Sequence, residues 1–82
     1  MDPFQEGYRA GALSEQVGGD HYKDMAIQPV EFIEKNGIRF LEGCIIKRAA
    51  RHDKKTGAGA QDLRKIIHEA TLLLQLRYGE KP

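Results

Sequence analysis

The sequence predicts an all-α domain of three helices with an extended N-terminal segment. Apolar residues recur at helical spacing in three segments between residues 29 and 78. A proline opens the first segment, and glycines separate the segments from one another. The chain has 82 residues, which is one domain at most. A chain this short buries only about 60% of the surface that its unfolded form exposes, so we expect it to gain stability as a homo-oligomer.

Residues 1–18 are rich in glycine and polar residues and show little periodicity, which predicts a mobile N-terminal arm. Residues 19–82 are expected to form the folded domain. The stretch "HYKDMAIQP" has no helical period and ends at Pro29. Because the residue before a proline is pushed toward extended geometry, this stretch should enter the first helix as an extended segment.

The segment "PVEFIEKNG" predicts a short helix from Pro29 to Asn36. Pro29 suits the first turn, where its missing N–H costs nothing. Val30 and Ile33 share a face, and Gly37 is a good left-handed stop. A second helix should follow, from Ile38 or Arg39 to about His52.

The second helix has two distinct sides on a helical wheel. Its apolar half is formed by Phe40, Leu41, Cys44, Ile45 and Ala49. Lys47, Arg51 and Lys54 fall together on another edge, which Gly43 and Ala50 flank. Small residues let a phosphate or a base approach a helix backbone closely, so this edge is a candidate ligand platform.

A third helix should run from about Ala60 to Tyr78, after the glycine-rich break at Gly57 and Gly59. We expect its core stripe to be Leu63, Ile66, Ile67, Ala70, Leu73 and Leu74. Leu72 and Leu76 lie on nearly the opposite side, one turn apart. Either the N-terminal arm or a second subunit could cover them, and the sequence favours neither.

Composition excludes several classes of protein. The single cysteine, Cys44, allows no internal disulfide, and the cysteine and histidine spacing fits no zinc site. No apolar run approaches the length of a membrane span, and no signal peptide is visible, so we expect a cytoplasmic protein. A formal net charge of +1 argues against a general nucleic-acid coat protein.

The positive charge is concentrated in one place. Five cations lie between Lys47 and Lys55, against Asp53 alone. Such a local field suits a small anionic ligand, although a solvated helix face would also be basic. The cations converge on the start of the third helix, where backbone N–H groups around Gly59 to Gln61 could hold phosphate from the other side. The loop "TGAGAQDL" lacks the lysine and hydroxyl of a Walker A motif.

Other polar residues are candidates for binding or acid–base chemistry. In "HYK", the Tyr22 ring could stack a base between His21 and Lys23, or simply pack under the helices. The acid–base candidates are His21, His52, His68, Glu42 and Asp62. Glu42 lies in an apolar sector and should have a partner, either Lys23 or an arginine. Asp62 suits the dipole of the third helix, and Cys44 reads as a packing residue.

These motifs, taken in order, resemble a small bacteriophage and prophage family. Its pattern is HYK, then I-x-P-x-[ED]-[FW]-I, N-G-[IL]-x-F-x-E-G, I-K-[YR]-x-x-R, K-x-G and D-L-x-K-A-x-H, over about residues 18–78 here. The family shares its domain with the nucleotide kinase of T-odd coliphages, which phosphorylates deoxynucleoside monophosphates without a Walker loop. The matching polar positions are His21, Tyr22, Lys23, Gln28, Glu42, Lys47, Arg51, Lys55, Asp62, Lys65 and His68.

The resemblance implies that residues 19–82 are a helical nucleotide-binding domain in the cytoplasm of a bacterial host. The expected nucleotide- and phosphate-binding residues are His21, Tyr22, Lys23, Lys47, Arg51, Lys54 and Lys55. As an enzyme, it would be a kinase-like phosphotransferase, with Glu42 and His68 as candidate catalytic residues and Mg²⁺ as a possible cofactor. As a binder, it would sequester nucleotide or cyclic-nucleotide signals of host immunity. A third possibility is an interaction protein whose basic patch meets a protein partner.

Overall fold

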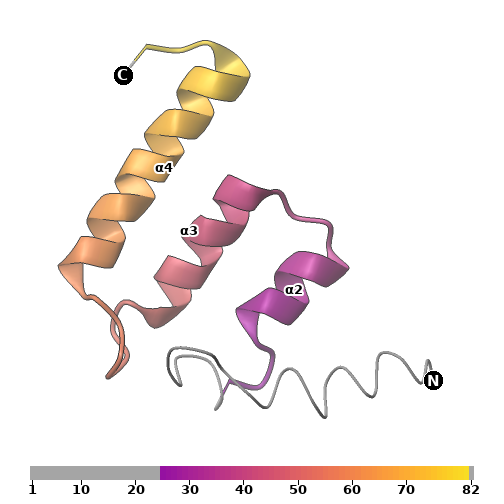
Figure 1. Cartoon of the computed structure of the whole chain (residues 1–82), viewed down its shortest axis with the longest axis vertical. Helices are drawn as coiled ribbons and strands as arrows, with labels where there is room; N and C mark the ends of the chain where they lie inside the picture. Colours follow the sequence, from indigo (N-terminus) through magenta and orange to yellow (C-terminus); the bar gives the residue numbers. More distant parts are fainter. Residues whose placement is uncertain (1–24, 82) are drawn as a thin grey trace.

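The computed structural model describes residues 25–81, which form three α-helices and no strand (Figure 1). The helices are α2 (Pro29–Lys35), α3 (Phe40–Arg51) and α4 (Ala60–Tyr78). The predicted all-α class is confirmed for this part of the chain, and the helix bounds agree closely with those expected. The predicted arm, residues 1–18, and the candidate site residues His21, Tyr22 and Lys23 lie outside the described residues.

The three helices form one open layer. Helix α3 lies in the middle, with α2 packed on one side of it and α4 on the other, and α2 and α4 do not contact each other (Figure 1). Because α2 and α4 do not meet, the three helices do not enclose a core, and no described helix covers either face of the layer. None of these helices is long and apolar enough to cross a membrane.

Local sequence explains the ends of α2. Gln28 has extended geometry (φ −75°, ψ 144°), as expected before a proline, and Pro29 occupies the first turn. At the other end Gly37 has φ +61° and donates its N–H to the Glu34 carbonyl, while Ile38 donates to the Ile33 carbonyl. This pair of hydrogen bonds is a Schellman motif, so the predicted left-handed stop at Gly37 is confirmed.

Gly43 allows α2 and α3 to pack closely. It is buried, and a Cβ at this position would lie 3.3 Å from Cγ2 of Ile33 on α2. The space beside Gly43 is therefore filled by a neighbouring helix. Our expectation that Gly43 leaves room for a phosphate or a base on α3 is wrong, because the small residue serves helix packing instead.

The loop between α3 and α4, residues 52–59, is tightly folded. Its backbone turns through hydrogen bonds from Lys54 N–H to the Arg51 carbonyl and from Gly57 N–H to the Lys54 carbonyl. A Cβ on residue 57 would lie 1.9 Å from the Arg51 carbonyl oxygen, so only glycine fits there without a shift of the backbone. The loop therefore returns against the end of α3 and places Lys54 and Lys55 beside it.

Helix α4 turns a different face toward α3 than its apolar pattern predicts. Asp62 and Glu69 are buried, whereas Leu63, Ile67 and Leu74 are 43%, 66% and 44% exposed. Ala70 is exposed as well, so most of the expected core stripe is not in a core; only Ile66 and Leu73 are half-buried. The reason is electrostatic: α3 presents arginines to α4, and the two acidic residues pair with them.

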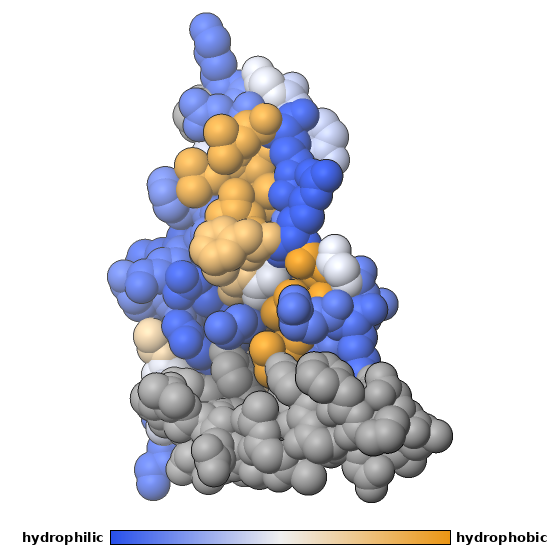
Figure 2. Space-filling model, turned by 45° about the vertical axis from the view of Figure 1, so that its right-hand side comes forward, coloured by the Kyte–Doolittle hydropathy of each residue, from blue (hydrophilic) through white to orange (hydrophobic). Residues whose placement is uncertain are grey.

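Apolar side chains also remain at the surface elsewhere. Figure 2 shows them gathered over the C-terminal half of α4 and the beginning of α3. In these elements Phe40 is 81% exposed and Leu76 is 72% exposed, whereas Leu72 is half-buried. Cover of Leu72 and Leu76, by the N-terminal arm or by a second subunit, stays a prediction.

Candidate functional site

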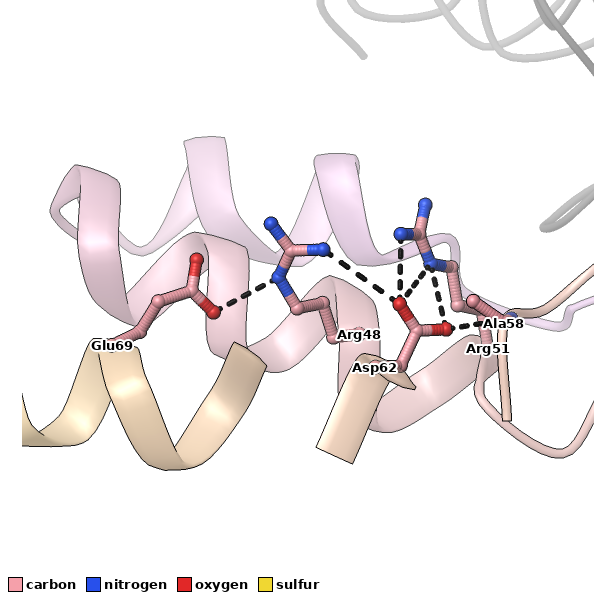
Figure 3. Close-up of polar contacts among 5 residues, drawn as sticks. All are labelled: Arg48, Arg51, Ala58, Asp62 and Glu69. Atoms are coloured by element: carbon pink, nitrogen blue, oxygen red, sulfur yellow. Dashed lines mark hydrogen bonds and ion pairs between the residues drawn. The ribbon is translucent and has the colours of Figure 1, made fainter. Parts of the chain in front are cut away.

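The candidate site is built around one buried carboxylate, Asp62, at the start of α4 (Figure 3). Its side chain is 0% exposed. Arg51 of α3 donates from Nη2 to Oδ1 at 2.9 Å and from Nε to Oδ2 at 3.2 Å, which is a forked contact. The backbone N–H of Ala58 donates to Oδ2 at 2.9 Å. Asp62 thus joins the end of α3, the loop and the start of α4.

These contacts stabilise the ionised form of Asp62. The hydrogen bond from Arg51 lowers the pKa of this carboxyl most, the bond from the Ala58 N–H lowers it further, and burial opposes both. The balance lowers the pKa from 3.8 to about 2. Asp62 is therefore a carboxylate at every physiological pH, and it is not suited to act as a general acid or base.

A second arginine extends this centre along the two helices. Arg48 donates from Nε to Oε1 of Glu69 at 2.9 Å, and its Nη1 lies 3.7 Å from Oδ1 of Asp62. The Arg48 and Arg51 side chains are 21% and 25% exposed, so both guanidinium groups are largely packed between the helices. We name Arg48, Arg51, Asp62 and Glu69 the ion-pair centre.

The ion-pair centre changes the interpretation of the positive charge. Of the five cations between residues 47 and 55, Arg48 and Arg51 are compensated by buried acids. Lys47, on α3 one turn before Arg51, is exposed, and so are Lys54 and Lys55 in the loop. Neither loop lysine forms an ion pair with a described residue. We name Lys47, Arg51, Lys54 and Lys55 the cationic corner.

Two of the backbone N–H groups that the sequence suggested as a phosphate cradle at the start of α4 already have partners. The N–H of Gly59 donates to the His52 carbonyl at 3.0 Å, and that of Gln61 donates to the Ala58 carbonyl at 3.2 Å. These two groups are occupied by the fold of the loop. The expected binding of phosphate by backbone N–H groups around Gly59 to Gln61 is therefore wrong for both of them, because the loop itself uses their hydrogens.

The two candidate catalytic residues, Glu42 and His68, lie on different helices. Glu42 accepts hydrogen bonds from both terminal nitrogens of Arg77, so its expected arginine partner is confirmed and comes from the far end of α4. Glu42 and Arg51 are nine positions apart on α3, a distance of about 13 Å along the helix axis. His68 is exposed on α4. The structure does not bring Glu42 to the cationic corner.

Carboxylates and histidines of the described residues do not gather into a metal site. No group of three or more such ligands is found among residues 25–81. The oxygens of the buried Asp62 accept hydrogen bonds from Arg51 and from the Ala58 N–H. Lys65, another position in the family pattern, is exposed on α4.

Sequence reasoning identified Arg51 and Asp62 separately and did not pair them. A signal was present: Arg48 and Arg51 are three residues apart on one helix, and Asp62 and Glu69 are seven apart on the next. Both spacings place the two charges on one face. When one helix carries two cations on one face and the next helix, after a short loop, carries two acids on one face, the pattern predicts ion pairs between the two antiparallel helices.

The chain was compared with protein families, curated proteins and solved structures. No family model, no curated protein and no solved structure was found to match the chain.

Proposed function

We propose that the protein binds a phosphorylated nucleoside, with the phosphate at the cationic corner. The observation that carries the proposal is that the loop holds Lys54 and its neighbour Lys55 at the end of α3, where the Lys54 N–H donates to the Arg51 carbonyl, while the buried Asp62 fixes the orientation of the Arg51 side chain. A guanidinium held in advance loses little freedom when a ligand arrives, and the two exposed loop lysines add positive charge that forms no ion pair with a described acid. The resemblance to the phage nucleotide kinase family supports a nucleotide as the ligand.

The position of Glu42 favours binding without phosphoryl transfer. A general base has to lie within hydrogen-bond reach of the group that it deprotonates. Glu42 is instead paired with Arg77, about 13 Å along α3 from Arg51. Two functions fit nucleotide binding at this corner: sequestration of a nucleotide or cyclic nucleotide, which the position of Glu42 favours, and a kinase-like phosphoryl transfer. One experiment distinguishes them.

The test is a panel of nucleoside mono-, di- and triphosphates and cyclic nucleotides, with inorganic phosphate as a further probe. Thermal shift reports binding, and chromatography of the same mixtures reports any product. We expect at least one nucleotide to raise the Tm. A shift without product supports sequestration, and a new phosphorylated product supports the kinase-like alternative.

Single lysine variants locate the phosphate. Lys54→Ala and Lys55→Ala should each weaken binding of the best nucleotide by about tenfold, which corresponds to about 1.4 kcal/mol for one charge-assisted contact. Lys81→Ala is the matched control, because Lys81 is an exposed lysine beyond the end of α4. Equal losses in all three variants that disappear in high salt would indicate a diffuse basic surface, as an interaction protein would have, and the phosphate site would be abandoned.

A further inference from the structure

The described helices leave α4 with an apolar surface that no other helix covers. Among the described helices, α4 contacts only α3, and the only fully buried side chain named for residues 25–81 is Asp62. Residues 25–81 therefore lack the closed apolar core that normally stabilises a small domain. Additional burial is needed, and the surface of α4 shows where it is available.

Four residues of α4 form a regular apolar line, Leu63, Ile67, Ala70 and Leu74, which we name the outer stripe. Their spacing of four, three and four residues is that of a coiled-coil seam. At 3.6 residues per turn, the stripe lies roughly 100° around the helix from Asp62, beside the face that contacts α3. Tyr78 continues it at the end of α4 and is 75% exposed.

We propose that a second copy of the chain covers the outer stripe, with α4 packed antiparallel against α4 of the partner. The stripe suits such self-pairing because its small residue, Ala70, lies near the centre of α4. A two-fold axis midway between Ile67 and Ala70 places Leu63 against Leu74 of the partner subunit and Ile67 against the partner's Ala70. Each large side chain then meets a complementary one, as an isologous interface requires.

The area of the outer stripe is adequate for a dimer. At these exposures, the side chains of Leu63, Ile67, Leu74 and Tyr78 present about 400 Å² per subunit, given roughly 150–200 Å² for a fully exposed side chain of this size. That value is in the range of the largest apolar patch on a typical monomer, about 300–600 Å², which often marks an interface. With Ala70 and the stems of flanking residues, two copies would bury about 1,000 Å², the lower bound for a specific interface.

The first test is the mass of the full chain by light scattering, with Ile67→Glu as the disrupting variant. We expect the wild type to have twice the mass of one chain. Ile67→Glu should raise the dimer dissociation constant at least tenfold with its helical circular dichroism retained. Gln75→Glu is the matched control, because it adds the same charge to α4 at an exposed polar position and should leave the mass unchanged.

A cross-linking experiment keeps the proposal testable if Ile67→Glu fails to fold. In a Cys44→Ser background, Ala70→Cys should form an intermolecular disulfide under mild oxidation, because the two helices cross near that residue. Gln75→Cys, on the outer polar side, should not. Leu76→Glu tests the other apolar flank of α4.

Three results would overturn the proposal. One is a single-chain mass for the wild type, with no cross-link through Ala70→Cys. Another is an oligomer that Leu76→Glu dissociates and Ile67→Glu does not. The last is cross-linking of Gln75→Cys in place of Ala70→Cys. The measurements need no nucleotide, so their outcome is independent of the proposed function.

Discussion

Replacement of Arg51 by lysine keeps the charge of the cationic corner and removes the fork that holds Asp62. Arg51 reaches both carboxylate oxygens, through Nη2 to Oδ1 at 2.9 Å and through Nε to Oδ2 at 3.2 Å. A lysine places all its donors on one nitrogen, so it cannot span two oxygens in the same plane. Asp62 is fully buried, and no water can replace the missing donor without a change in packing.

The expected magnitude follows from the hydrogen bonding that the substitution removes. A hydrogen bond to a charged group contributes about 1.5–3 kcal/mol, and Arg51→Lys removes the equivalent of one. The free energy of unfolding should therefore fall by about 2 kcal/mol, which lowers the Tm by about 10 °C for a chain of this size. Thermal unfolding followed by circular dichroism measures the change, at one fixed protein concentration because an oligomer melts in a concentration-dependent way.

Arg39→Lys is the matched control for this experiment. Arg39 is an exposed arginine that precedes α3, and its replacement should change the free energy of unfolding by less than about 0.5 kcal/mol. If Arg51→Lys melts within about 2 °C of the wild type, the fork contributes little and the ion-pair centre does not hold the two helices together. A variant that melts lower but keeps its full nucleotide-induced rise in Tm would show that Arg51 is structural and does not touch the ligand.

Three further predictions follow from the same contacts. Pairing lowers the Asp62 pKa from 3.8 to about 2, so the stabilisation by ionised Asp62 is present above about pH 4 and is lost as the pH falls through 2. The free energy of unfolding of Asp62→Asn should therefore depend less on pH between about 4 and 2 than that of the wild type, as acid titration followed by circular dichroism would measure. Gly57→Ala should lower the Tm more than Gly37→Ala does. The new methyl group at position 57 would overlap the Arg51 carbonyl, whereas Gly37→Ala costs only about 1–2 kcal/mol of backbone strain at φ +61°. Equal losses of Tm would contradict the close approach of the loop to the end of α3. A double-mutant cycle of Glu42→Gln and Arg77→Gln should give a coupling energy of about 0.5–1 kcal/mol, since the pair is about one-third exposed, and zero coupling would mean that it does not form in solution.

The helices could be predicted because their signals are local. Pro29 and Gly37 bound α2, and the glycines before Ala60 mark the start of α4. Each of these residues acts through its own backbone geometry, which does not depend on what packs nearby. The same holds for the partner of Glu42, since a carboxylate in an apolar sector needs a cation wherever the chain supplies one.

The faces of α4 could not be predicted, because they depend on what α3 presents. A wheel of α4 shows apolar residues over more than half of its circumference, so hydrophobicity alone does not choose which of them turn inward. The arginines of α3 decide the matter by drawing Asp62 and Glu69 between the helices. Leu63 and Ile67 are left outside, and their exposure is what suggests a second copy.

Asp62 links the fold of the cationic corner to its proposed use. The same carboxylate orients Arg51 and, through the N–H of Ala58, holds the loop that carries Lys54 and Lys55. Any substitution of Asp62 therefore moves the loop lysines as well as the arginine, and a loss of nucleotide binding in such a variant would say nothing about which group touches phosphate. The lysines are different, because their side chains are exposed and neither forms an ion pair with a described residue. A loss of binding in Lys54→Ala or Lys55→Ala that Lys81→Ala does not share, with an unchanged Tm in the absence of ligand, therefore identifies a contact with the ligand.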